Sequence, residues 1–219
     1  MMGRLSMRER GLLGIGVLSA LAYFAALWNQ IPVMQVLTKS LPVITMALWL
    51  RPWNTRDGRL IAIGLILSAL GDLLLESSPQ FFLAGLLAFL TAHLAYLAAF
   101  VGRTRALALG SAIPIAVFGG ATFVTLAPYL GSLVGAVIAY ILVICMMMWR
   151  AWAQVTDAHI ARPVAWLAAL GATSFAISDT LVAYNRFIAP IFGLKLLLMG
   201  LYWAGQWGIA ASAARLRAT

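Results

Sequence analysis

The sequence has few charged residues and almost no cysteine or histidine. Only 10% of its 219 residues are Asp, Glu, Lys or Arg, against about 25% in an ordinary soluble domain. Such a chain cannot cover a water-exposed surface with polar groups, which excludes a soluble globular fold. A single cysteine, Cys145, excludes an intramolecular disulfide and a thiolate metal cluster.

Motifs of the common cofactor and metal enzymes are also missing. His93 and His159 lie far apart in the sequence and do not have the spacing of metal ligands. The chain contains no P-loop, no nucleophile elbow and no dinucleotide-binding glycine pattern. The sequence therefore predicts no metal site and no cofactor.

Long apolar runs fill most of the chain, with 63% hydrophobic residues and a mean hydropathy of +0.97. They predict an all-α membrane protein, a single domain over residues 1–219 that forms a bundle of eight transmembrane helices. The first run is longer than the apolar part of a cleaved signal peptide, so we interpret it as a retained helix. The predicted helices cover residues 11–28, 33–50, 60–76, 81–101, 106–126, 129–149, 164–184 and 191–212.

The net charge of +9 could indicate nucleic-acid binding, but the basic residues follow the predicted loops. Twelve of the 15 Lys and Arg residues fall in loops on one side, and only Arg186 lies on the other. Basic loops mark the cytoplasmic side of a membrane protein. We therefore predict no nucleic-acid partner, and an integral protein of a bacterial inner (plasma) membrane with both termini in the cytoplasm.

Two aspartates lie inside predicted helices, Asp72 in Gly71–Glu76 and Asp179 in Ser178–Leu181. An ionised side chain at membrane depth costs roughly 2.5–3.5 kcal/mol even on the lower scales, so such residues are usually functional. At 1.5 Å per residue, both lie roughly 6–8 Å from the outer ends of their helices. Lys39 and Lys195 lie at a similar depth, roughly 9 and 6 Å inside their helices. We therefore expect the two aspartates to meet in one pocket near the non-cytoplasmic face.

The other polar residues in the helices have both functional and structural interpretations. Lys39 and Lys195 can act as counter-ions of the aspartates or can hold a phosphate, and Lys195 can also extend to the surface. His93 and Tyr96 share one helix face, as do Lys195, Tyr202 and Gln206. Glu76 is interpreted as a solvated cap at the water interface.

The order of these residues also indicates a duplication. Asp72, Phe81, Gly85 and His93 resemble in their order Asp179, Phe187, Gly193 and Tyr202. An offset of four helices predicts a parallel repeat of four plus four helices about an axis along the membrane normal.

The ordered set of motifs resembles the YhhN family of small eight-helix membrane proteins, which includes lysoplasmalogenases. The resemblance runs from the second to the eighth predicted helix, and Trp203 stands where a second tyrosine is expected. The motifs that carry it are Thr38-Lys39-Ser40-Leu41-Pro42, Gly71-Asp72, Gly85…Phe89…His93…Tyr96, Ser178-Asp179…Phe187 and Tyr202…Gln206.

The resemblance implies an ether-bond hydrolase that cleaves the vinyl ether bond of lysoplasmalogen. The products would be a fatty aldehyde and glycerophosphocholine or glycerophosphoethanolamine, and the partners a lysophospholipid substrate and membrane lipid. Enol ether hydrolysis needs an acid and a second carboxylate, which we assign to Asp72 and Asp179 without deciding which is which. The expected substrate-binding residues are Lys39, His93, Tyr96, Asn185, Arg186, Lys195, Tyr202 and Gln206.

An ion-coupled transporter is the main alternative, because it also places Asp and Lys pairs at membrane depth. A retinal-binding photoreceptor would use Lys195 as a Schiff base, but this residue is near its helix end.

Overall fold

The computed structural model describes residues 6–191 and 193–216, and these residues form α-helices and short 3-10 helices without a β-strand. The chain divides into two compact units, one up to Ala92 and the other from His93 onward. The all-α prediction is confirmed for the described residues, whereas the single domain and the repeat of four plus four helices stay predictions.

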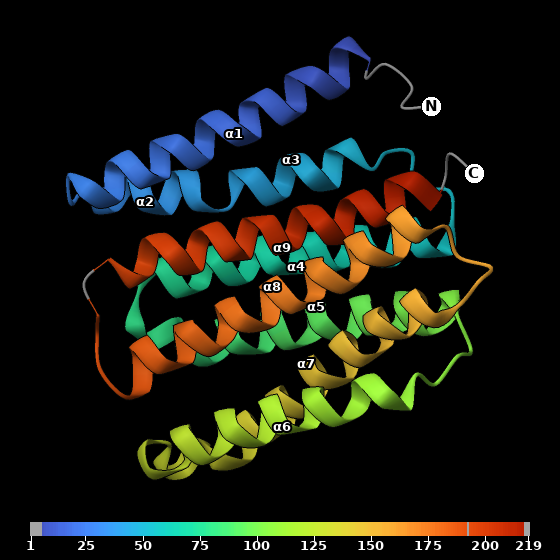
Figure 1. The fold of residues 1–219 in the computed structure, drawn as a ribbon. Helices are drawn as coiled ribbons and strands as arrows, with labels where there is room; N and C mark the ends of the chain where they lie inside the picture. The colour runs from blue at the N-terminus through green and yellow to red at the C-terminus, as the bar shows by residue number, and fades with distance from the viewer. Residues whose placement is uncertain (1–5, 192, 217–219) are drawn as a thin grey trace. The chain divides into compact units, whose positions relative to one another are not determined.

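In the first unit, residues 6–92 form four α-helices and the start of a fifth. These are α1 (Met7–Trp28), α2 (Pro32–Lys39), α3 (Leu41–Trp49), α4 (Arg56–Ser77) and the beginning of α5 (Phe82–Arg103), with a 3-10 turn η1 (Pro79–Phe81). Helix α1 lies along α2 and α3, and both of these pack against α4 (Figure 1).

Local hydrogen bonds define where the helices of this unit begin. Ser6 and Glu9 form a reciprocal capping box at the start of α1, and the Thr55 hydroxyl accepts the Gly58 N–H at the start of α4. These caps satisfy backbone N–H groups that have no partner within the helix. Both caps precede an apolar helix, so the first residues of α1 and α4 are determined by the local sequence.

The predicted helix over residues 33–50 is two helices, because the helix is interrupted at Ser40. Pro42 lacks the N–H that would continue the hydrogen-bond ladder, and its ring crowds the preceding turn. The Ser40 hydroxyl instead donates to the Ala69 carbonyl of α4 at 3.0 Å. The interruption therefore attaches the end of α2 to α4 and places Lys39 beside that helix.

The second unit contains the remainder of α5 and four further α-helices. They are α6 (Leu109–Leu126), α7 (Val134–Ala153), α8 (Arg162–Phe187) and α9 (Leu194–Leu216), with 3-10 turns η2 (Ala127–Tyr129), η3 (Gly131–Leu133) and η4 (Gln154–Thr156). Helix α7 packs against both α6 and α8, and α8 lies along α9 (Figure 1).

The contact between α8 and α9 depends on glycine. A Cβ atom on Gly205 would lie 2.8 Å from the Phe175 nitrogen, and one on Gly171 would lie 2.8 Å from the Ile209 nitrogen. A Cβ atom on Gly208 would lie 2.9 Å from the Gly171 Cα atom. Small residues allow helix backbones to approach this closely in membrane proteins. The two helices therefore hold the side chains on α8 and α9 in a narrow range of positions.

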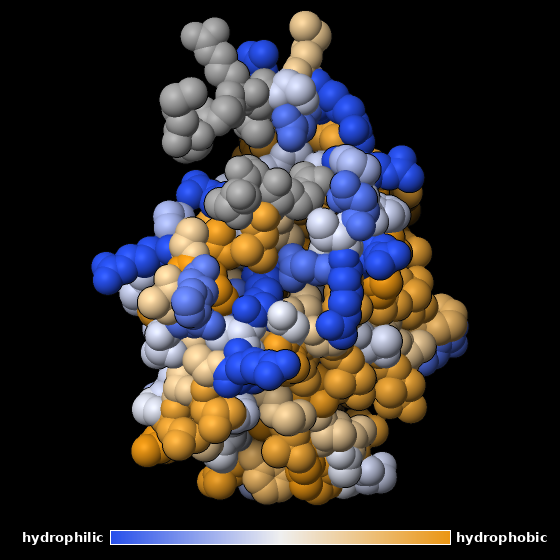
Figure 2. Space-filling model, turned by 90° about the vertical axis from the view of Figure 1, so that its right-hand side faces the viewer, coloured by the Kyte–Doolittle hydropathy of each residue, from blue (hydrophilic) through white to orange (hydrophobic). Residues whose placement is uncertain are grey.

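The outward surfaces of the helices carry many large apolar side chains, among them Ile15, Leu70, Ile113 and Val124. Figure 2 shows orange hydrophobic residues over large areas of one face, beside blue hydrophilic ones. Among the described residues, six helical segments are long and apolar enough to cross a membrane, namely Met7–Trp28, Arg56–Ser77, Pro79–Arg103, Leu109–Tyr129, Gly131–Thr156 and Arg162–Phe187. Because of these apolar helices and their apolar outer surfaces, the chain is an integral membrane protein. The presence of eight membrane-spanning helices stays a prediction.

Candidate active site

Lys39, Asp72 and Glu76 form an ionic group in the first unit, called here the Lys39 cluster. The Lys39 Nζ atom donates to Glu76 Oε2 at 2.9 Å and lies 3.8 Å from Asp72 Oδ1. Lys39 and Asp72 are both buried. Opposite charges at this distance attract one another. The structure thus places Lys39 as a counter-ion, one of the two roles that the sequence leaves open.

The cap interpretation of Glu76 is wrong. Only 9% of its side chain is exposed, because it is turned towards Lys39 rather than towards water. Glu76 follows Asp72 by four residues, so the two carboxyl groups share one face of α4. One ammonium group therefore serves two carboxyl groups, and the closer of them is Glu76.

His93, Tyr140, Phe175 and Asp179 form a second group, called here the Asp179 cluster, within the second unit. The Tyr140 hydroxyl donates to Asp179 Oδ2 at 2.5 Å. The His93 Nε2 atom lies 3.6 Å from the same oxygen, and the His93 side chain is fully buried. Asp179 keeps 14% of its side chain exposed. A carboxyl group with two polar neighbours and some accessible surface can exchange protons with a bound molecule.

Aromatic contacts connect the Asp179 cluster to two more of the predicted site residues, and a hydrogen bond connects it to a third. The Phe175 ring lies 4.6 Å from the His93 ring, 6.3 Å from the Tyr96 ring and 5.3 Å from the Tyr202 ring. The Tyr96 hydroxyl donates to Gln206 Oε1 at 2.7 Å. The structure therefore brings His93, Tyr96, Tyr202, Gln206 and Asp179 together in one unit, and their action as a common site stays a prediction.

The three other predicted binding residues lie at the ends of α8 and α9. Asn185 Oδ1 accepts the backbone N–H of Ile191 at 3.0 Å, so this side chain holds the α8–α9 loop. Arg186 is exposed near the end of α8. Lys195 is half-buried, and because α9 begins at Leu194 it lies in the first turn. The predicted helix start at residue 191 placed Lys195 too deep.

The sequence prediction missed Tyr140, which makes the shortest contact to Asp179. Tyr140 is the one hydroxyl-bearing residue in the apolar run from Val134 to Trp149. A lone hydroxyl in such a run was the available signal, because a buried phenol usually has a hydrogen-bond partner. What the sequence could not provide was the partner, which lies 39 residues away on another helix.

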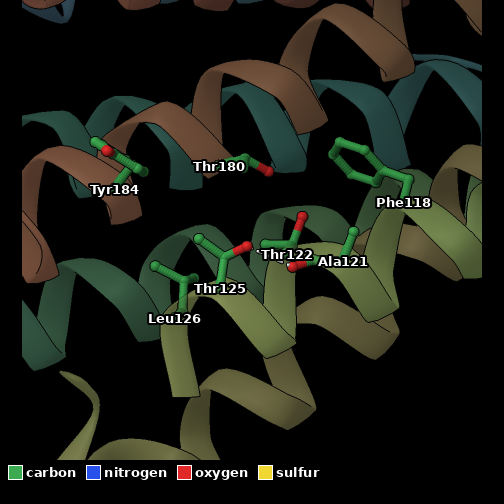
Figure 3. A pocket seen from close by; sticks show the side chains of 7 residues that line it. All are labelled: Phe118, Ala121, Thr122, Thr125, Leu126, Thr180 and Tyr184. Atoms are coloured by element: carbon green, nitrogen blue, oxygen red, sulfur yellow. Dashed lines mark hydrogen bonds between the residues drawn. The ribbon is translucent and has the colours of Figure 1, made fainter. Parts of the chain in front are cut away.

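A cleft of about 220 Å³ lies between α6 and α8. Figure 3 shows that Phe118, Ala121, Thr122, Thr125 and Leu126 line it from α6, and Thr180 and Tyr184 from α8. None of the predicted site residues lines this cleft. Thr180 follows Asp179, but successive residues of a helix point about 100° apart. We therefore keep the Asp179 cluster, rather than the cleft, as the candidate centre.

Asp72 and Asp179 belong to different units, and each has its own partners. Their meeting in one pocket stays a prediction. Within residues 6–191 and 193–216, no three His, Cys, Asp or Glu side chains are grouped so that they could hold a metal ion.

Comparison with known proteins supports the resemblance found in the sequence. The model of the YhhN family matches residues 34–213. Lysoplasmalogenase TMEM86A of Bos taurus is 32% identical over 197 residues, which cover 84% of this chain and 80% of that protein. Lysoplasmalogenase TMEM86B of Homo sapiens is 33% identical over 205 residues, which cover 91% of this chain and 84% of that protein.

A bacterial relative is matched over a shorter stretch. The lysoplasmalogenase of Mycobacterium bovis is 32% identical over 160 residues, which cover 68% of this chain and 57% of that protein. No solved structure matches the chain.

Proposed function

The chain belongs to the YhhN family, and from this premise we propose that it is a lysoplasmalogenase. The reaction is hydrolysis of the vinyl ether bond of a lysoplasmalogen to a fatty aldehyde and glycerophosphocholine or glycerophosphoethanolamine. The names of the relatives support this reaction over an ion-coupled transporter. The structural observation that carries the proposal is the Asp179 carboxyl group beside His93 and Tyr140, in a helical protein with an apolar exterior.

The chemistry requires one proton donor and one water molecule. A proton adds to the β-carbon of the enol ether, its π bond breaks, and an oxocarbenium ion forms. Water then adds to the α-carbon and loses a proton, which leaves a hemiacetal. The hemiacetal hydroxyl then loses its proton and the glycerol oxygen gains one, so the carbon–oxygen bond breaks and the aldehyde and the alcohol are released. Carboxyl groups act on a similar cation in glycoside hydrolysis.

We assign this acid/base chemistry to Asp72 and Asp179. Asp179 accepts a hydrogen bond from Tyr140, which suits a carboxylate that stabilises the cation or takes a proton from water. Asp72 is the more distant carboxyl partner of Lys39, whose hydrogen bond is to Glu76. Asp72 and Asp179 together form the acid/base pair of this assignment.

The polar residues around these carboxyl groups serve binding in the proposal. Arg186 and Lys195, at the end of α8 and the start of α9, hold the phosphate of the substrate. His93, Tyr96, Tyr202 and Gln206 orient water or the glycerol hydroxyl groups. Lys39 acts as the counter-ion of Asp72 and Glu76, and Asn185 positions the loop that carries the phosphate-binding residues.

The surroundings of the enzyme follow from the same proposal. Eight transmembrane helices, related as four plus four, place both termini in the cytoplasm of a bacterium, and the inner membrane supplies the lysophospholipid. The alkenyl tail of the substrate stays among apolar side chains while the ether bond reaches the carboxyl groups.

The test is aldehyde release by purified protein in detergent from a vinyl-ether lysolipid and from its saturated ether analogue. We expect aldehyde from the vinyl ether alone. Asp72→Asn and Asp179→Asn should each lower turnover by at least about a hundredfold, because general acid–base catalysis contributes that much.

Asp57→Asn is the matched control, since it makes the same chemical change in the first turn of the helix that carries Asp72. Its turnover should equal that of the unchanged protein. Full activity in both Asp72→Asn and Asp179→Asn would refute the assignment of the carboxyl groups, and absence of aldehyde from folded wild-type protein would refute the reaction.

A further inference from the structure

Tyr140 contacts two other members of the Asp179 cluster, Asp179 and His93. Its hydroxyl is 2.5 Å from Asp179 Oδ2, and its ring meets the His93 ring edge-on, with centroids 5.3 Å apart and planes at 79°. The His93 Nε2 atom lies 3.6 Å from the same Oδ2 atom. Two side chains from α5 and α7 thus converge on one oxygen of a carboxyl group on α8.

The hydrogen bond to Oδ2 fixes the orientation of the Asp179 carboxyl group. The terminal torsion of an aspartate is broad and roughly two-fold, so the carboxyl group alone does not select an orientation. A short hydrogen bond to Oδ2 selects one, because charge-assisted hydrogen bonds are roughly twice as strong as neutral ones. The direction of the other oxygen, Oδ1, is then set by the backbone of α8 and the position of Tyr140.

Packing alone does not account for the hydroxyl group. A phenylalanine at this position would fill nearly the same volume and keep the edge-on contact with His93. Instead the apolar run from Val134 to Trp149 carries one phenol, and that phenol is directed at the carboxyl group with the proposed catalytic role.

We propose that Tyr140 is a positioning residue for the reaction, which holds Oδ2 of Asp179 so that Oδ1 is presented to the reacting group. This inference rests on the proposed function. Tyr140 itself does not exchange a proton with the substrate; it acts through Asp179.

The first variant is Tyr140→Phe, which removes only the hydroxyl. With a vinyl-ether lysolipid as substrate, kcat should fall about ten- to a hundredfold, as expected for loss of a hydrogen bond to a charged group. The KM should stay within about twofold, because the ring and the proposed phosphate-binding residues are unchanged. Tyr129→Phe, at an exposed tyrosine in η2, is the matched control and should keep both constants.

A second measurement reports on the hydrogen bond without turnover. The infrared carboxylate band of Asp179 is obtained by subtracting the spectrum of Asp179→Asn, and it should shift in Tyr140→Phe but not in Tyr129→Phe. If the phenylalanine variant does not fold, 3-fluorotyrosine at position 140 keeps the ring and hydroxyl while changing donor strength, and it should also shift the band.

An unshifted band in either Tyr140 variant would overturn the inference, because the hydrogen bond would then be absent. A shifted band with wild-type kcat and KM would also overturn it, since the hydrogen bond would not serve the reaction. Failure of the proposed function is a different result: there Asp179→Asn itself would keep releasing aldehyde.

Discussion

At the scale of single residues, Lys39 pairs with two carboxyl groups of α4. One ammonium group lies within 4 Å of two carboxyl groups, at 2.9 Å from Glu76 and 3.8 Å from Asp72. Removing one partner of a buried ion pair leaves an uncompensated charge, which is more costly than the pair itself is stabilising. Lys39 therefore contributes both to the stability of the fold and to the surroundings of Asp72, one of the proposed catalytic residues.

We predict that Lys39→Met lowers the free energy of unfolding by about 3 kcal/mol or more, because two carboxyl groups lose their cation. The measurement is thermal unfolding in detergent, followed by tryptophan fluorescence. Lys39→Arg keeps the positive charge, so its free energy of unfolding should fall by less. Arg59→Met removes a cation from an exposed position and should change the free energy of unfolding little. A Lys39→Met variant as stable as Arg59→Met would contradict this role.

Asp157 provides a second prediction at the residue scale, outside the membrane-spanning segments. Hydrogen bonds from the Thr104 hydroxyl and then from the His159 backbone lower the pKa of Asp157 below its usual value. A lowered pKa in the folded protein means that the carboxylate stabilises the fold above pH about 4, its ordinary pKa. That contribution is lost as the pH falls through the lower folded value.

We therefore predict that Asp157→Asn lowers the thermal midpoint near neutral pH, and that the difference from wild type shrinks on acidification below pH about 4. Thr104→Val removes the hydroxyl that donates at 2.5 Å and should reproduce the effect. A difference that stays constant from pH 7 to pH 3 would show that the carboxylate is not responsible.

At the scale of elements, the pair α8 and α9 organises the second unit. Asp179 lies on α8, Tyr202 and Gln206 lie on α9, and the two backbones approach closely at Gly171, Gly205 and Gly208. The Ser178 hydroxyl adds a hydrogen bond to the Leu198 carbonyl at 2.8 Å. A small separation of these helices would displace site residues on both.

We predict that Gly205→Ala destabilises the protein by about 1–3 kcal/mol, the usual cost of overpacking, because its Cβ would meet the Phe175 backbone. Activity should fall as well, since Gln206 is the next residue. Gly200→Ala in the same helix is the control, because a Cβ there has no neighbour within 4 Å and alanine favours a helix. Equal melting of the two variants would argue against close packing at Gly205.

At the scale of the whole molecule, the apolar exterior fits a membrane, and the basic residues of the loops predict one orientation in it. The outward helix faces carry large apolar residues, and twelve basic residues fall on one predicted side. Orientation decides from which leaflet the lysophospholipid enters.

This orientation is testable with single cysteines in a Cys145→Ala background. Leu107 follows α5 and Ala189 follows α8, and both are exposed. A membrane-impermeant thiol reagent applied to intact cells should label Ala189→Cys and leave Leu107→Cys unlabelled until the cells are opened. The reverse pattern would invert the proposed topology, and labelling of both in intact cells would mean that they share the outer side.

The sequence by itself determined the class of the protein and the approximate positions of its helices. Scarcity of charge and long apolar runs predict membrane helices, and each of the eight predicted ranges contains an α-helix of the described structure, although 33–50 is divided at Ser40 and four ranges begin before their α-helix. Capping residues, prolines and apolar periodicity act over a few residues, so they are visible in a linear chain. The motifs from Thr38 to Gln206 also indicated the family, because their residues and their order can be read directly from the sequence.

Only the tertiary structure decided which side chains meet. Glu76 as the hydrogen-bond partner of Lys39, Tyr140 as the donor to Asp179, and the Tyr96–Gln206 pair join residues that lie 37, 39 and 110 positions apart. Such pairs depend on helix rotation and on close backbone approach at glycine. Neither is a property of one segment, since both arise when helices pack to bury polar groups away from lipid.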